Sequence, residues 1–153
     1  MKYTSEININ LSRDEVHKKL DNPENMKHWQ EGLIGYKQLS EEPGKEGAQM
    51  ELYYKIGKRE MTLIETIMVN NFPYEFQATY DAKGVHNFQK NYFEVIDDST
   101  TKWISESEFQ FSGFMMKLMG FIMPGAFKKQ SKKSLSDFKA FAEKGISVAK
   151  SQE

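Results

Sequence analysis

The chain has 153 residues, enough for one domain with a sizeable core, and it carries eleven Phe, seven Tyr and two Trp. Its formal net charge of −1 gives no overall attraction to nucleic acid, so no nucleic-acid partner is expected. Cysteine is absent, which excludes disulfides, thiol catalysis and thiolate metal ligands. No apolar run is long and continuous enough to span a bilayer, and the alternating N-terminus is unlike a signal peptide. We therefore expect a cytoplasmic protein without stable membrane insertion.

The N-terminal residues predict one strand followed by two short helices. Residues 3–11 alternate apolar and polar side chains, as a half-buried strand does. Ser12 and Glu15 then have the spacing of a helix capping box, and the helix that begins there should end near Leu20. Pro23 suits the first turn of a second short helix, which should reach Trp29.

The middle of the chain predicts six more strands. Gly, Pro, Asn and Asp recur as turn residues about every 12–15 positions, the spacing of an antiparallel meander. The apolar-rich runs between these turns cover residues 33–39, 50–56, 61–69, 74–80, 85–96 and 103–111. With the first strand, they make seven strands.

The last long segment predicts an amphipathic helix. At 100° per residue, one face carries Phe127, Ser131, Ser134, Leu135, Phe138, Phe141 and Ala142, and the opposite face is rich in lysine. Residues 113–123, which precede this helix, are apolar nearly all round. We expect Phe114 and Leu118 to lie in the core, Met116 and Met123 to form an exposed apolar patch, and Pro124 to kink the chain.

A seven-stranded antiparallel sheet with only one long helix to cover it must curl around that helix. The predicted class is therefore α+β, with a curved sheet wrapped around the C-terminal helix and two short helices after the first strand. Residues 1–145 form the single expected domain, and residues 146–153 are expected to be a loosely held tail.

Four stretches resemble the START-like, Bet v 1-like superfamily, and the chain looks like an SRPBCC or polyketide-cyclase-type protein. They are ININLSRDEVHKKL, DNPENMKHW, MTLIETIMV and SLSDFKAF. The resemblance implies a helix-grip fold. It also implies that a hydrophobic or amphipathic small molecule, such as a lipid, binds between helix and sheet, where some members also catalyse reactions.

The binding site should be lined by residues on the inner faces of the strands and of the long helix. The region of Trp29 should form part of the entrance to this site. The expected ligand-binding residues are Trp29, Met50, Leu52, Tyr54, Phe76, Tyr80, Asn91, Trp103, Ser107, Leu118, Phe127, Ser131, Ser134 and Phe138. No cofactor is expected.

Several of these candidates are polar residues among apolar neighbours. Ser131 and Ser134 either donate to a ligand or bond to the carbonyls one turn back in their own helix. Asn91 and Ser107 share a strand face with aromatic residues, where neutral polar groups can orient a ligand. The alternative for these two is that they lie at the open end of the sheet and contact only water.

Glu65 is the one candidate for a catalytic residue. It is in step with Met61, Leu63, Ile67 and Val69, and a carboxyl group on that face, if buried, has a raised pKa suited to acid–base chemistry. In the other register Thr62, Ile64, Thr66 and Met68 face the core and Glu65 faces water. We favour this second register.

His17, His28 and His86 lack metal-ligand partners at i+2 or i+4, so no metal site is expected. Three functions stay open: a carrier or sensor of a hydrophobic molecule, a cyclase- or dehydratase-like enzyme using Glu65 or a tyrosine, and a protein interaction module. The carrier or sensor is preferred. A monomer or weak homodimer is expected.

Overall fold

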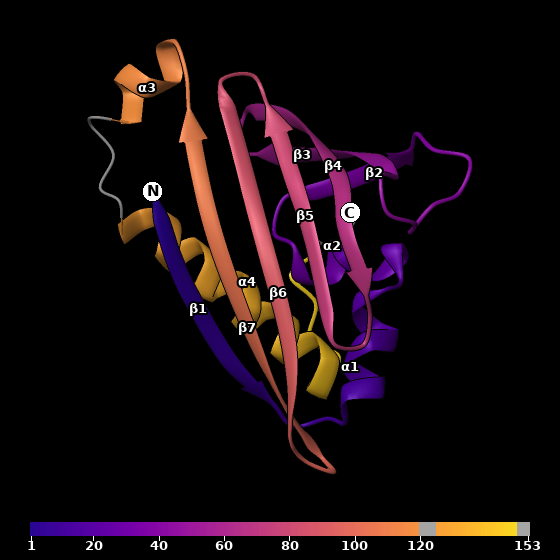
Figure 1. Cartoon of the computed structure of the whole chain (residues 1–153). Helices are drawn as coiled ribbons and strands as arrows, with labels where there is room; N and C mark the ends of the chain where they lie inside the picture. The colour runs from indigo at the N-terminus through magenta and orange to yellow at the C-terminus, as the bar shows by residue number, and fades with distance from the viewer. Residues whose placement is uncertain (120–124, 150–153) are drawn as a thin grey trace.

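A seven-stranded antiparallel sheet curves around one long helix (Figure 1). The structure is a computed structural model that describes residues 1–119 and 125–149. The strands are β1 (Lys2–Ile9), β2 (Leu33–Gln38), β3 (Gln49–Ile56), β4 (Arg59–Asn71), β5 (Glu75–Ala82), β6 (Val85–Asp97) and β7 (Thr100–Phe111). The helices are α1 (Arg13–Leu20), the 3₁₀ helix η1 (Pro23–Asn25), α2 (Met26–Trp29), α3 (Phe114–Met119) and α4 (Gly125–Lys144). The predicted fold class is confirmed.

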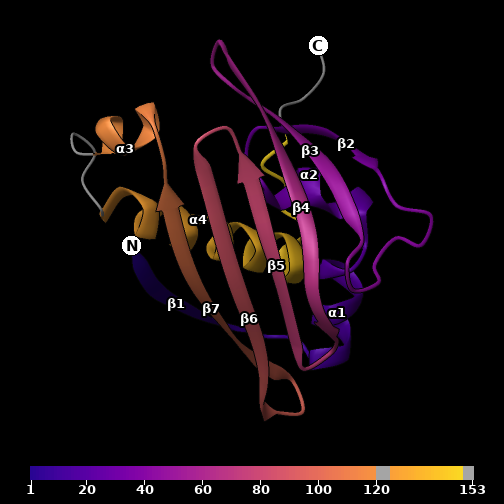
Figure 2. The ribbon, with the colours of Figure 1, turned by 45° about the horizontal axis from the view of Figure 1, so that its top comes forward.

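The order of strands in the sheet is β1-β7-β6-β5-β4-β3-β2. Strands β2 to β7 therefore form a meander in which each strand pairs with the next, whereas β1 pairs with the last strand of the chain. Helix α4 lies across the concave face of the sheet, and α1 and α2 lie on the same side (Figures 1 and 2). Helix α1 contacts β6 and β7, whereas α2 contacts β2 and α4. The concave face and α4 thus enclose the core.

Helix α1 begins at the predicted capping box. The Ser12 hydroxyl accepts a hydrogen bond from the backbone N–H of Glu15 at 3.3 Å, and the Glu15 carboxylate accepts one from the Ser12 N–H at 3.4 Å. These two bonds satisfy backbone donors that a helix start otherwise leaves unpaired.

Replacing Ser12 with alanine should lower the free energy of unfolding by about 1 kcal/mol, because the cap is lost. Urea denaturation of the variant measures this loss. Ser136→Ala is the control, since Ser136 is exposed within α4 and caps nothing at a helix start. A Ser12 variant as stable as the control variant would contradict the capping role.

The core consists of two apolar clusters. The first joins the ends of β1, β6 and β7 to α1 and α4, and its fully buried members include Ile9, Val16 and Phe138. The second lies on β2, β3 and α2, where Leu33, Met50 and Leu52 are buried against Met26. Because the clusters are distinct, the middle of the concave face is left to other side chains.

The apolar segment before α4 differs from its prediction. Phe114 is 74 % exposed, so its assignment to the core was wrong, whereas Met116 is exposed as predicted. The short helix α3 instead rests on the β5–β6 turn through Met115, which contacts Gly84. Met123 and Pro124 lie outside the described residues.

The chain after α4 contacts α2. The backbone N–H of Val148 donates to the His28 carbonyl at 2.9 Å, and the Ser147 hydroxyl lies 2.8 Å from His28 Nδ1. These bonds join residues 147 and 148 to the second short helix.

Candidate functional site

Strand register places Glu65 on the concave face. Across neighbouring strands, Glu65 lies opposite Met50 on β3 and Tyr80 on β5, and Tyr80 lies opposite Asn87 on β6. Directly opposed residues of antiparallel strands point to the same side of a sheet. Since Met50 and Asn87 are buried, Glu65 and Tyr80 share their inward orientation.

The favoured register for β4 was therefore wrong. Ile67 is buried and Met68 is 49 % exposed, so the odd-numbered side chains from Met61 to Ile67 face inward. A β-bulge between Ile67 and Val69 then shifts the pairing, and Val69 lies opposite Gln77. Glu65 is one of the inward residues and is half-buried.

Two tyrosines share the concave face with Glu65: Tyr80 lies opposite it, and Tyr54 lies opposite Met61 of the same strand. Burial raises the pKa of the Glu65 carboxyl, and hydrogen bonding from Tyr80 partly offsets this rise. Burial and the Glu65 charge both raise the pKa of Tyr80 and of Tyr54. The Tyr54 hydroxyl donates a hydrogen bond to Gln30 Oε1, just beyond α2. These residues form an oxygen-rich group, the Glu65 cluster: Glu65, Tyr54, Tyr80 and Gln30.

Replacing Glu65 with glutamine should stabilise the folded protein at neutral pH and leave its stability almost unchanged at low pH. A carboxyl whose pKa is raised by folding favours the folded state below its unfolded pKa, about 4.3, and loses that contribution as the pH rises through the folded pKa. Glutamine has no such titration. Thermal denaturation of both proteins from low to neutral pH measures the difference in stability between Glu65→Gln and the wild type.

Glu60→Gln is the matched control, because Glu60 is an exposed carboxylate on the same strand. Its stability should follow the wild-type pH profile. A stability difference between Glu65→Gln and the wild type that stays constant with pH would contradict the raised pKa of Glu65.

A hydrogen-bonded network occupies the centre of β6 and β7. Asn87 Nδ2 donates to Ser107 Oγ at 2.8 Å, and Gln89 Nε2 donates to Asn87 Oδ1 at 2.8 Å. Trp103 Nε1 donates to Asn91 Oδ1 at 2.9 Å. Asn91 and Ser107 are buried, so the alternative that they contact only water at an open end is wrong. Their predicted role toward a ligand stays a prediction.

Helix α4 turns its predicted apolar face, which carries Phe127, Ser131 and Phe138, toward the sheet. Ser131 Oγ lies 2.7 Å from the Tyr3 hydroxyl. The Ser131 hydroxyl therefore bonds to β1, and not to a carbonyl one turn back in its own helix. Phe127 packs against the ring of Phe109 at a centroid distance of 5.0 Å. Ser134, between these two positions and Phe138, is half-buried.

Trp29, the last residue of α2, packs between β7 and α4. Its ring meets Trp103 and Phe138 edge-on, at centroid distances of 6.1 and 5.3 Å. The indole N–H of Trp29 is buried and has no hydrogen-bond partner among the residues that the structure describes. Such a donor is costly to leave unpaired, by about 1–3 kcal/mol.

The structure brings most of the predicted lining residues together. Met50, Leu52, Tyr54, Phe76, Tyr80, Asn91, Trp103 and Ser107 lie on the concave face, and Phe127, Ser131, Ser134 and Phe138 lie on α4. Leu118 differs, because it lies on α3 beyond the end of β7. Sequence reasoning missed Gln30, which follows a short helix and carries no periodic signal, and Tyr3, whose place opposite Ser107 comes from the β1–β7 pairing.

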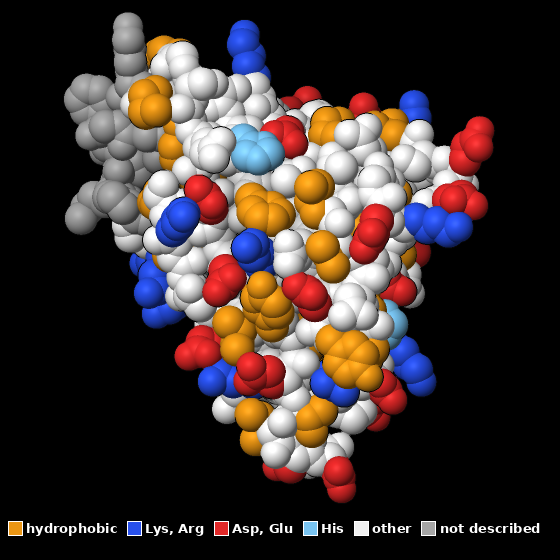
Figure 3. Space-filling model, viewed as in Figure 1, with side chains coloured by type: hydrophobic (Ala, Val, Ile, Leu, Met, Phe, Trp, Pro, Cys, Tyr) orange, Lys and Arg blue, Asp and Glu red, His pale blue; other side chains and the backbone are white. Residues whose placement is uncertain are grey.

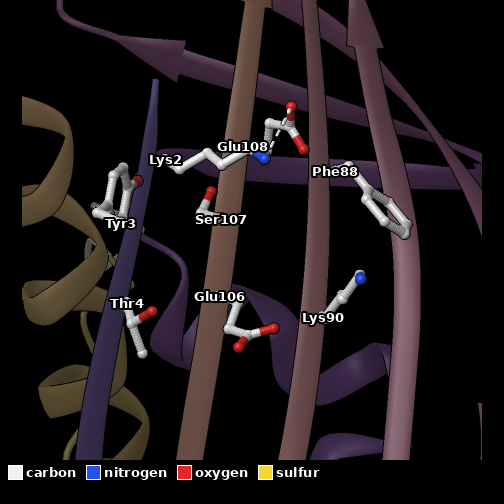
Figure 4. Close-up of a pocket in the computed structure, with 8 residues that line it drawn as sticks. All are labelled: Lys2, Tyr3, Thr4, Phe88, Lys90, Glu106, Ser107 and Glu108. Atoms are coloured by element: carbon white, nitrogen blue, oxygen red, sulfur yellow. Dashed lines mark ion pairs between the residues drawn. The ribbon is translucent and has the colours of Figure 1, made fainter.

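Two surface hollows lie away from the Glu65 cluster. One, of about 340 Å³, is on the outer side of β1, β6 and β7, and charged side chains such as Lys90, Glu106 and Glu108 line it (Figure 4). The other, of about 430 Å³, lies between η1, α2 and β2. On the convex face, acidic and basic side chains alternate with hydrophobic ones (Figure 3). That face is therefore a poor match for a purely apolar ligand.

Within residues 1–119 and 125–149, no group of three or more His, Cys, Asp or Glu is placed to hold a metal ion. In the same part of the chain, no helix combines the length and apolar character needed to cross a membrane.

No family model and no curated protein matches the sequence, but many solved structures match its fold. Ara h 8.0201 is 11 % identical with a TM-score of 0.72, over 93 % of this chain and 97 % of that chain. A START superfamily protein from Mycobacterium smegmatis is 12 % identical with a TM-score of 0.69, over 94 % of each chain. The di-domain ARO/CYC StfQ, from the steffimycin biosynthetic pathway, is 14 % identical with a TM-score of 0.69, over 95 % of this chain and 45 % of that chain. The chain has the helix-grip fold of Bet v 1-like and START-like structures.

Proposed function

We propose that the protein binds a hydrophobic or amphipathic small molecule between α4 and the concave face of the sheet, as a carrier or sensor. The observation that carries this proposal is the polar middle of the concave face. Asn87, Gln89 and the Glu65 cluster lie there beside two separate apolar clusters. A few polar groups within an apolar surface are typical of sites that orient a small ligand.

The half-buried side chains support the same proposal. Tyr54, Glu65, Tyr80 and Ser134 face the enclosed side of the sheet or helix and still keep part of their surface accessible. Burial of apolar ligand surface would then supply most of the binding free energy, at about 25 cal/mol per Å² before the costs of ordering.

Native mass spectrometry of the protein as purified, followed by denaturing extraction, tests the proposal. A stoichiometric adduct of an apolar compound supports it. Thermal denaturation with a panel of lipids and polyketides gives an independent readout, because a ligand at 100 times its Kd adds about 2.7 kcal/mol to stability. An unadducted mass together with no stabilisation across the panel would overturn the proposal.

A variant pair on α4 locates the site. Ser134→Phe should fill space between α4 and the sheet and abolish ligand-induced stabilisation, whereas Ser136→Phe points a matched ring into solvent and should preserve it. Equal responses of the two variants would place the ligand elsewhere.

Acid–base catalysis is the second candidate, in the manner of a cyclase or dehydratase. The inward Glu65, whose pKa is raised by burial, and its Tyr80 neighbour favour this function, because a carboxyl with a raised pKa holds its proton more readily and is suited to acid–base chemistry. An enzyme should lose turnover in Glu65→Gln while it retains binding. Turnover that survives this change would exclude Glu65 as the catalytic group.

A further inference from the structure

Three oxygen-bearing side chains meet on the concave face from three adjacent strands. Tyr54 comes from β3, Glu65 from β4 and Tyr80 from β5. Glu65 and Tyr80 are direct cross-strand partners, and each tyrosine is close enough to Glu65 for the charge to raise its pKa. Tyr80 is therefore the direct neighbour of Glu65, and Tyr54 lies further along the same face of the sheet, opposite Met61.

The hydrogen bonds of these three side chains leave acceptor lone pairs on the concave face. The Tyr54 hydroxyl hydrogen is donated to Gln30 Oε1, and Tyr80, the cross-strand partner of Glu65, has a single hydroxyl hydrogen that the neighbouring carboxylate can accept. A phenol has only one hydrogen to donate, and an ionised carboxylate has none. What remains on both tyrosines and on Glu65 is lone pairs. A complementary ligand group is one that donates several hydrogen bonds.

The charge of Glu65 is also unbalanced. Among the described residues, no lysine, arginine or histidine forms a salt bridge with Glu65. A carboxylate in such a place is costly when ionised and gains from a positive partner. Tyr36, Tyr54 and Tyr80 pack on the adjoining apolar cluster with Leu52 and Leu63, so aromatic and aliphatic surface adjoins the charge.

We propose that the Glu65 cluster binds the ammonium group of an amphipathic amine whose apolar body lies against the neighbouring apolar cluster. This assignment rests on the proposed function and specifies its ligand class. An ammonium group supplies up to three donors to the free lone pairs, and its hydrogen bond to Glu65 is charge-assisted. A ligand carboxylate would instead meet the Glu65 charge and lone pairs only.

Three probes with the same eight-carbon chain separate the head groups: octylamine, octanol and octanoate. Isothermal titration calorimetry at mildly alkaline pH, where the amine is protonated, gives each Kd. Octylamine should bind at least about tenfold more tightly than octanol, since a hydrogen bond to a charged group contributes about 1.5–3 kcal/mol. Octanoate should bind more weakly than both.

Glu65→Gln should remove the preference for the amine, so that the octylamine and octanol affinities become about equal, because the carboxylate charge that favours the ammonium group is lost. Glu60→Gln is the matched control on the same strand, and it should keep the full preference, because Glu60 is exposed. Glu60→Gln therefore corrects for a general effect of one lost negative charge on a cationic probe.

Acidic pH should reduce the preference in the wild-type protein, because protonation of Glu65 removes its charge. Tyr54 and Tyr80 are the other titratable groups that face Glu65, and both stay neutral through this range because burial raises their pKa. In Glu65→Gln the ratio of the octylamine and octanol affinities should be independent of pH over the same range.

Each outcome has a distinct meaning. Equal binding of octylamine and octanol, stronger binding of octanoate, or an amine preference that persists in Glu65→Gln would overturn the ammonium assignment and leave the proposed function standing. Failure of octanol and octylamine alike to bind, with an unadducted mass and a silent ligand panel, would overturn the proposed function itself.

Discussion

Replacing Phe138 with alanine should lower the free energy of unfolding by about 3–5 kcal/mol. Phe138 is 0 % exposed, and its ring meets those of Trp29 and Trp103 edge-on at centroid distances of 5.3 and 5.4 Å. Truncation removes contacts with both rings and leaves a cavity where α4 meets the sheet and α2. The urea midpoint should fall accordingly, with an unchanged slope.

Phe114→Ala is the control, because the Phe114 side chain is 74 % exposed. Its cost should stay within about 0.5 kcal/mol, as for other surface substitutions. Comparable losses in the two variants would mean that α3, and not only α4, contributes a buried aromatic to the core.

Replacing Gly84 with alanine should cost more than about 2 kcal/mol, the second-largest effect that we expect. Gly84 has a φ of +77°, a conformation that costs an ordinary residue about 1–2 kcal/mol. A Cβ added there would also lie 2.7 Å from Met115 Cγ and 3.1 Å from the Ser112 carbonyl oxygen. The steric clash adds to the backbone strain.

Gly57→Ala separates these two costs. Gly57 has a φ of +63° in the β3–β4 turn, and a Cβ there would meet nothing within 4 Å. It should therefore show the backbone cost alone, about 1–2 kcal/mol. If urea denaturation gave equal losses for Gly57→Ala and Gly84→Ala, the close packing of α3 on the β5–β6 turn would be contradicted.

Local patterns predicted most of the fold. The capping box at Ser12 and Glu15 depends on residues three positions apart, and the alternation on β6 and β7 follows from the period of a strand. Both kinds of signal are complete within a short window of sequence. The elements that these signals predict are present, from the first strand to the long helix α4.

The orientation of Glu65 could not be predicted in this way. Both faces of its strand carry apolar residues, such as Leu63 on one and Ile64 on the other, so alternation does not distinguish them. The choice is made by pairing with Met50 and Tyr80. A β-bulge then shifts the pairing before Val69, so simple alternation wrongly places Val69 on the same face as Glu65.

The same limit explains Phe114 and Gln30. Phe114 begins a helix too short for periodicity to assign a face, and its exposure depends on how α3 rests on the β5–β6 turn. Gln30 joins the Glu65 cluster only because Tyr54 comes to it from another strand. Contacts between distant segments are set by tertiary packing.

The pairing of β1 with β7 determines when the protein can finish folding. Lys2 lies opposite Glu108, so this pairing closes a loop of about a hundred residues, which is slow compared with forming a hairpin. During synthesis on the ribosome, β1 emerges first and waits for its partner until nearly the whole meander has been made. Assembly of the curved sheet is thus a late event, and a chain that stops before β7 leaves its first strand without the neighbour it has in the finished protein.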